Sequence, residues 1–176
     1  MRHLAVSVLF VGLVGEAVAG VRPLNGLAQE STPMADMAAM PAGSVGLTPR
    51  VLARVEPATA AGQELQLVRV DVAPGATVAP HTHPGTIALC LESGSFTFGI
   101  VEGVATVTRA ATAATPEAAE QLADAETMLA PGDCVTFNAS TTVHTLRNTG
   151  GPAVIWQAQL YALGATATTF LATPTP

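Results

Sequence analysis

From Arg50 onward, apolar and polar residues alternate in short runs, which is the pattern of β-strands that bury one face. Glycine, proline, asparagine and serine separate the runs. The pattern predicts strands at residues 50–55, 65–72, 86–91, 95–101, 104–109, 134–138, 143–147 and 153–161. Glu102-Gly103 lies between two of these runs and predicts a hairpin. Many short strands with frequent turns indicate an all-β sandwich or barrel.

Residues 110–126 interrupt this alternation. Pro116 is followed by Ala118, Ala119 and Leu122, and proline is favoured at the first position of a helix. We therefore expect one short helical insertion in an otherwise all-β domain.

The N-terminal residues 1–19 have the features of a secretory signal peptide. A short polar start precedes the apolar run from Leu4 to Val14, and Ala17-Val18-Ala19 offers a small-residue cleavage site. A second cleavage site follows Ala28. Because a membrane-spanning helix needs ~20 apolar residues, we expect no stable membrane span after cleavage and a secreted or extracytoplasmic protein. An uncleaved anchor is the alternative.

The composition divides the rest of the chain into three parts. Residues 20–46 are rich in proline, glycine, alanine, serine and methionine and are expected to be a flexible linker. Residues 47–165 contain the predicted strands and form the barrel domain. Residues 166–176, rich in threonine, alanine and proline, are expected to be a loose tail.

The charged residues exclude one class of partner. All seven basic residues are arginines, and thirteen acidic residues give a net charge of −6. The arginines do not cluster, and phosphate contacts require grouped basic side chains. We therefore expect no nucleic-acid partner.

Three histidines remain after the signal segment: His81, His83 and His144. His81 and His83 are two positions apart, so on a strand both side chains project from the same face. His144 belongs to a later predicted strand, and it can add a third nitrogen if that strand lies across the barrel. Three protein ligands with open positions are typical of a reactive or ligand-binding metal site. We therefore predict a divalent metal ion bound by these histidines.

The histidines lie within two spaced groups of residues. The first group consists of Gly75, His81, His83 and Gly94, and the second consists of Gly132, Asn138, His144 and Asn148. Their spacings resemble the two motifs of the cupin superfamily, over about residues 65–161. The resemblance implies a single jelly-roll β-barrel with the three histidines as metal ligands.

The sequence departs from the cupin pattern in both motifs. The first motif has a glutamate where this chain has Ile87, so no carboxylate is available there. In the second motif, Asn138 and Ser140 replace the usual proline and glycine, and one extra residue precedes His144. Three neutral imidazoles leave a divalent charge uncompensated. Such a centre should favour anionic ligands, and it should prefer Fe, Cu, Ni or Zn to Mn. A degenerate, weakly metallated site is the alternative.

Spacing alone leaves Cys90 and Cys134 as a disulfide or as two buried thiols. The cupin resemblance implies that their strands are neighbours and that both side chains face outward. It therefore favours a disulfide.

The resemblance makes a dioxygenase-like oxidoreductase the leading enzyme class, and the uncompensated metal charge favours a small anionic substrate, although fold alone does not determine function. Gln157, Gln159 and Tyr161 share one face of the last predicted strand and are candidates for substrate binding at the barrel mouth, or they face solvent. The alternative function is a non-catalytic module that binds a small ligand or a metal. Cupins often pair, so a homodimer is also expected.

Overall fold

In a computed structural model of the chain, residues 43–112 and 117–171 are described, and these form eleven strands and no helix. The predicted signal peptide and residues 20–42 of the predicted linker lie outside the described residues. No segment among the described residues is a helix long and apolar enough to cross a membrane. The strands are β1 (Ser44–Val55), β2 (Gln63–Thr82), β3 (Gly85–Ser93), β4 (Phe96–Glu102), β5 (Ala105–Arg109), β6 (Ala118–Leu122), β7 (Ala125–Leu129), β8 (Cys134–Asn138), β9 (Val143–Arg147), β10 (Ala153–Ala162) and β11 (Thr169–Phe170).

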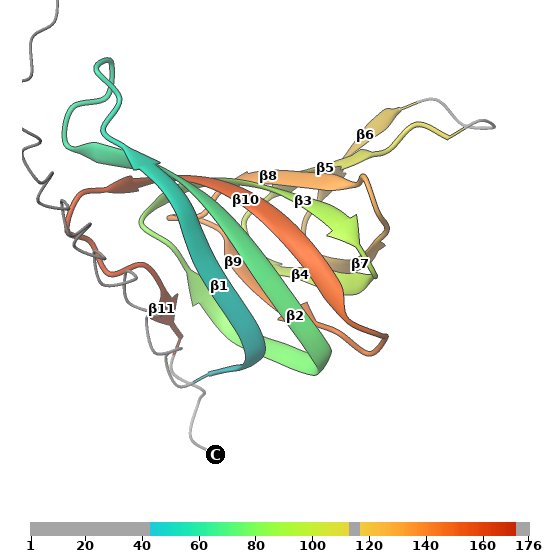
Figure 1. The fold of residues 1–176 in the computed structure, drawn as a ribbon. Coiled ribbons are helices and arrows are strands. Elements are labelled where there is room, and N and C mark those ends of the chain that lie inside the picture. Colours follow the sequence, from blue (N-terminus) through green and yellow to red (C-terminus); the bar gives the residue numbers. More distant parts are fainter. Residues whose placement is uncertain (1–42, 113–116, 172–176) are drawn as a thin grey trace, which may run out of the picture. The chain divides into compact units, whose positions relative to one another are not determined.

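The strands belong to one antiparallel sheet that curls into a nearly closed barrel (Figure 1). Along the sheet the order is β6-β5-β8-β3-β10-β2-β9-β4-β7. The long strand β2 connects the two halves: its first half pairs with β10 and its second half pairs with β9 and β11, while β1 pairs along both halves, from Leu65 to Val78. The prediction of an all-β barrel is confirmed.

The barrel core comes from the inward face of each strand. On β2 the side chains of Val68, Val70 and Val72 are buried, and on β3 those of Ile87 and Leu91 are buried. Phe96, Phe98, Leu129, Val135, Phe137 and Ile155 complete the interior. Burying a side chain of this size stabilises a fold by about 1.5–3 kcal/mol, so the core favours one register for every strand.

Along β2 the inward-facing side chains change from polar to apolar. Gln66 is half-buried on the same face as Val68, whereas Leu65 and Leu67 are about 40% exposed on the opposite face. The apolar run at Leu65–Val68 therefore does not mark one buried face. Its two leucines point away from the barrel interior.

The predicted helical insertion at 110–126 is wrong. Ala118–Leu122 is strand β6, which pairs with all five residues of β5. Helix propensity is a weak preference that tertiary pairing can overrule. Here the pairing is reinforced by a salt bridge from Arg109 to Glu120 (2.6 Å) and by a hydrogen bond from Gln121 to the Thr106 hydroxyl (2.8 Å). Pro116 itself lies outside the described residues.

The predicted hairpin at Glu102-Gly103 is also wrong. Gly103 turns the chain with a positive φ of 89°. However, β4 pairs with β7 and β9, while β5 pairs with β6 and β8. The turn therefore carries the chain from one half of the barrel to the other. A glycine turn changes the direction of the chain, but it does not determine whether the two strands that flank it pair with each other.

Arg109 connects the two ends of the sheet, β6 and β7. Its guanidinium donates hydrogen bonds to Glu120 on β6, to the Thr127 hydroxyl and Met128 carbonyl on β7, and to Asp133. Burial alone would raise the pKa of Asp133, but the N–H groups of Ala110 and Ala130 and the Arg109 guanidinium together lower it. The Arg109 side chain thus links β6 and β7 by hydrogen bonds at the seam, the place where these two end strands of the sheet meet.

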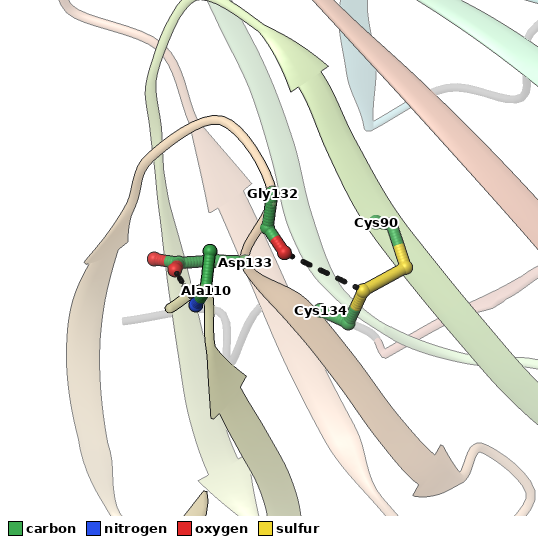
Figure 2. The surroundings of a disulfide bond; sticks show 5 residues. All are labelled: Cys90, Ala110, Gly132, Asp133 and Cys134. Carbon is green, nitrogen blue, oxygen red and sulfur yellow. Dashed lines mark hydrogen bonds between the residues drawn. A yellow bond between two sulfur atoms is a disulfide. The ribbon is translucent and has the colours of Figure 1, made fainter. Parts of the chain in front are cut away.

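Cys90 and Cys134 are directly opposite each other on β3 and β8 and form a disulfide (Figure 2). Their Cα atoms are 4.1 Å apart. Cys134 follows the turn at Gly132-Asp133, whose aspartate accepts a hydrogen bond from the Ala110 amide (Figure 2). The disulfide therefore joins two neighbouring strands at the outer surface of the barrel, beside the seam that Arg109 spans.

The C-terminal residues are held more closely than their composition suggests. Thr169 and Phe170 pair with the end of β2, and the Leu171 amide donates a hydrogen bond to the Pro80 carbonyl (2.9 Å). The expected loose tail at 166–176 is therefore bound to the barrel as far as Leu171, and residues 172–176 lie outside the described residues. Similarly, the first strand begins at Ser44, within the predicted linker.

We predict that removing the disulfide lowers the free energy of unfolding by about 4 kcal/mol, because it closes a loop of 44 residues in the unfolded chain. Equilibrium urea denaturation of the Cys90→Ser/Cys134→Ser variant tests this. Reduced and oxidised wild-type protein provide the matched comparison, since the variant should resemble the reduced form. Equal stability of the reduced and oxidised protein would contradict the prediction.

Candidate metal centre

The three histidines lie close together in the barrel. Two of them are on strands β2 and β9, and the third lies just beyond the end of β2. His81 lies near the end of β2, and His83 follows the last residue of that strand. His144 lies on β9, where it is the direct cross-strand partner of His81. Antiparallel pairing therefore brings residues from distant parts of the sequence side by side.

The imidazole rings form a tight cluster. The ring centres of His81 and His144 are 4.0 Å apart, and the ring centre of His83 lies 4.8 Å from that of His81 and 5.2 Å from that of His144. One nitrogen from each ring lies within 4.8 Å of the others. Metal–nitrogen bonds of ~2.1 Å place ligand nitrogens roughly 3–4 Å apart. Small ring rotations would bring all three within reach of one ion.

Hydrogen bonds determine which nitrogen each ring offers. Every Nδ1 atom lies within hydrogen-bonding distance of a backbone carbonyl, and a carbonyl can only accept, so Nδ1 carries the proton. The acceptors are Ala79 for His81 (2.8 Å), Ala167 for His83 (2.6 Å) and Thr142 for His144 (3.3 Å). The Nε2 lone pairs remain for a ligand, and such hydrogen bonds orient the histidine ligands of metal sites.

Burial keeps the three imidazoles neutral. It lowers the pKa of His83 to about 4, although the bond to Ala167 partly opposes this. Burial, followed by the neighbouring His81 and His83, lowers the pKa of His144 to about 2. The pKa of His81 is lowered by burial as well. At neutral pH all three rings are therefore neutral imidazoles with one free nitrogen lone pair, as metal ligation requires.

Apolar side chains form the wall behind the cluster. The rings of Phe137 and Phe98 lie 4.7 and 5.6 Å from that of His144. Ile87, where the cupin motif has a glutamate, is buried at 1% exposure. Among the described residues, the candidate ligand group contains the three histidines and no carboxylate. Glu92 is exposed and accepts a hydrogen bond from the Trp156 indole, so it does not replace the missing acid.

The three residues proposed for substrate binding lie on the inward face of β10. Tyr161 is buried, and its ring stacks on that of His83 at 5.8 Å with an interplanar angle of 14°. Within the described part of the chain its hydroxyl makes no hydrogen bond of good geometry, and burial raises its pKa, although the nearby Gln157 side chain partly opposes this. Gln157 donates to Gln159 (2.9 Å), which donates to Gln66 (2.7 Å). Tyr161 is therefore adjacent to the cluster, and the two glutamines form a polar strip leading away from it.

Sequence reasoning missed the contribution of the C-terminal segment. The Ala167 carbonyl orients His83, and the Phe170 ring lies 5.4 Å from the His81 ring. Gly43 lies under that phenylalanine, where a β-carbon would be 2.7 Å from the Phe170 ring. The single aromatic residue in a threonine- and alanine-rich stretch was the only sequence signal of this contact.

Comparison of the coordinates with solved structures identifies the architecture. A cupin-2 domain protein from Rhodospirillum rubrum matches with a TM-score of 0.50 and 14% identity, over 77% of this chain and 72% of that one. A cupin 2 conserved barrel domain protein from Rhodopseudomonas palustris matches with a TM-score of 0.50 and 13% identity, over 77% and 73% of the two chains. The barrel has the cupin fold.

A third solved structure that matches is the DMSP lyase DddQ from Ruegeria pomeroyi DSS-3. Its TM-score is 0.50 and its identity is 18%, over 74% of this chain. This chain spans about half of the lyase, 54% of its length. No protein-family model and no curated protein sequence matches the chain. The likeness therefore concerns the fold of the cupin barrel.

We predict that the metal-free protein loses stability as the pH falls from about 6.5 towards 4. In this range the unfolded histidines, with pKa values near 6.5, bind protons that the folded His83 and His144 do not bind. The resulting loss of stability is therefore absent above pH 6.5 and grows as the pH falls below it. Urea denaturation in the presence of a chelator should show a smaller pH dependence for His83→Gln than for wild type. An unchanged slope would contradict the assignment.

Proposed function

We propose that this cupin barrel binds one divalent metal ion through His81, His83 and His144, and that the centre acts on a small anionic substrate as a dioxygenase-like oxidoreductase. The observation that carries the proposal is that one ring nitrogen from each of the three histidines lies within 4.8 Å of the others, while every Nδ1 atom is within hydrogen-bonding distance of a carbonyl. Three protein ligands leave further coordination positions for a substrate.

The donor set supports both the choice of metal and the charge of the substrate. Imidazole suits Fe, Cu, Ni and Zn better than Mn, which prefers oxygen ligands. With Ile87 in place of an acid, the candidate ligand group among the described residues contains no carboxylate to offset the charge of a divalent ion. An anionic substrate supplies that charge. When bound, the metal polarises the substrate, and an iron or copper ion also supports reaction with O₂.

Tyr161 and Gln157 are the residues best placed to hold such a substrate. A buried hydroxyl without a well-formed hydrogen bond is rare and costs ~1–3 kcal/mol, so the Tyr161 hydroxyl, which has none to the described residues, suits a ligand oxygen beside the candidate centre. The Gln157 side chain lies near enough to oppose the raised pKa of Tyr161. We propose that Tyr161 donates a hydrogen bond to the substrate and that the Gln157–Gln159 strip contacts its far end.

Two further features support activity outside the cytoplasm. The apolar run Leu4–Val14 precedes a small-residue cleavage site. The Cys90–Cys134 disulfide suits an oxidising compartment. We propose that the protein is exported and that its cupin barrel works there.

A non-catalytic ligand- or metal-binding module is the second candidate function. The observation that favours it is the absence of an acidic side chain from the histidine cluster among the described residues. His81 and His144 are also only 5% exposed, which restricts access to the centre. The DMSP lyase shows that one structural neighbour is an enzyme. Turnover distinguishes the two candidates.

We predict that replacing any one histidine with alanine weakens metal binding by more than roughly 100-fold, since loss of an outer partner alone costs 10–100-fold. Isothermal titration of chelator-treated protein with Zn and Cu, together with metal analysis, measures this. Met128→Ala, at an exposed position on β7, is the control and should bind like wild type. A His144→Ala variant with wild-type affinity would contradict the proposed site.

Oxygen uptake by the iron- and copper-loaded proteins with catechols, flavonols and thiols then separates the candidates. Uptake by wild type that is lost in His81→Ala supports the oxidoreductase. Stoichiometric metal binding without uptake supports the binding module.

We predict that Tyr161→Phe retains the metal but binds a small anion roughly tenfold more weakly, which corresponds to the loss of one hydrogen bond. Azide titration of the copper-loaded protein, followed by visible absorption, measures this affinity. Met128→Ala again serves as the control. An unchanged azide affinity would show that the hydroxyl does not contact the bound anion.

A further inference from the structure

A row of hydrogen-bonded side chains runs along the inner face of β2 and β10, which lie side by side (Figure 1). Gln157 donates a hydrogen bond to Gln159 (2.9 Å), and Gln159 donates one to Gln66 (2.7 Å). Gln66 in turn donates to the carboxylate of Glu64. We call the three glutamines and Glu64 the amide chain. Glu64 is the cross-strand partner of Tyr161, so strand pairing places the amide chain beside the candidate centre.

The carboxylate at one end sets the direction of every hydrogen bond in the amide chain. An ionised carboxylate can only accept, so Gln66 turns its NH2 group toward Glu64. The Gln66 oxygen is then left to accept from Gln159, and the Gln159 oxygen to accept from Gln157. The other charged group at this end, Arg54, lies 3.9 Å from the carboxylate and can only donate, so it offers no competing acceptor. Each amide is therefore oriented by its neighbour.

The last amide of the chain, Gln157, lies at the proposed substrate site. One of its N–H groups is used by Gln159, and within the amide chain its oxygen accepts nothing. The buried Tyr161 hydroxyl, which makes no hydrogen bond of good geometry to the described residues, is close to the same side chain. The structure thus brings together a hydroxyl that can donate and an amide oxygen that can accept. Such a pair suits a ligand that offers both an acceptor and a donor.

We propose that Glu64 is a positioning residue that directs the Gln157 oxygen toward the substrate. The site should then prefer an anion that carries a hydrogen-bond donor, such as a hydroxy acid, to one that carries only acceptors, such as a keto acid. This inference rests on the proposed function, in which the centre and Tyr161 hold the anionic group. A hydroxyl hydrogen satisfies the Gln157 oxygen, whereas a ketone oxygen leaves it unpaired, and an unpaired polar group in a site is the usual source of strong discrimination.

Lactate and pyruvate test the preference, because they differ only in a hydroxyl against a ketone. Displacement of azide from the copper-loaded protein, followed by visible absorption, gives both affinities. The ratio of the two is compared between variants, since the intrinsic preference of the metal is the same in each. Glu64→Lys puts a donor at the end of the amide chain and reverses it, so the preference for lactate should fall by roughly tenfold.

Two further variants complete this experiment. Glu64→Gln keeps the size of the side chain and can donate or accept, so its ratio should lie between those of wild type and Glu64→Lys. Glu117→Gln removes the same charge at an exposed position before β6 and should keep the wild-type ratio. A ratio that is unchanged in both Glu64 variants, or that shifts toward lactate, would overturn the proposal.

A second measurement needs no metal. In NMR spectra of the metal-free protein, Glu64→Gln should shift the side-chain NH2 signals of all three glutamines in the amide chain, and Glu117→Gln should shift none of them. A change confined to Gln66 would overturn the proposal, because the orientation would then not reach Gln157.

The two measurements together separate the possible failures. If the NH2 signals respond as expected but the copper-loaded protein binds neither anion, the proposed function fails and the substrate preference fails with it. If both anions bind and the ratio does not change, the positioning role of Glu64 alone is wrong.

Discussion

The pairing of β2 with β9 is the contact on which the candidate centre depends. It makes His81 and His144 cross-strand partners although more than sixty residues separate them, and it leaves their ring centres 4.0 Å apart. His83, just beyond the end of β2, joins them because the strand ends there. Three buried imidazoles so close together would disfavour protonation in any fold, and here burial lowers the pKa of each. The three imidazoles are therefore already neutral before a metal binds.

The same long strand also links the inside of the barrel to its outside. In the stretch Glu64–Leu67, β2 presents polar side chains to the interior and leucines to the exterior, the reverse of its arrangement at Val68–Val72. Neighbouring side chains of a strand point to opposite faces of the sheet, so polar residues on the inner face here require the leucines to lie on the outer face. A polar lining near the candidate centre is thus obtained together with an apolar outer face.

The features of this structure that could be predicted from the sequence are those determined by the spacing of residues close together in the chain. The His81-x-His83 pair lies on one strand and its turn, and the glycine and asparagine spacings of the cupin motifs accompany it. The barrel class also follows from alternation alone. The interior position of Ile87 follows from the same strand parity.

The remaining features depend on pairing partners that no local pattern specifies. Ala118 and Ala119 have high helix propensity, yet they pair with β5 and form part of strand β6. Gly103 signals a turn, but which strands flank it is decided across the barrel. Leu65 and Leu67 resemble core residues until the register of β10 shows that they face outward. Contacts made by backbone atoms, such as that of Ala167, have almost no sequence signature.

The contact between the Ala167 carbonyl and His83 determines which sequence changes the candidate centre can tolerate. The acceptor that orients His83 is the main-chain oxygen of residue 167, which every amino acid possesses. Point substitutions at that position leave the acceptor in place, so drift in the side chains of the terminal segment is tolerated there. A change in the number of residues between β10 and β11 would displace the oxygen instead. Insertions and deletions, rather than replacements, are therefore the genetic events to which this imidazole is most vulnerable.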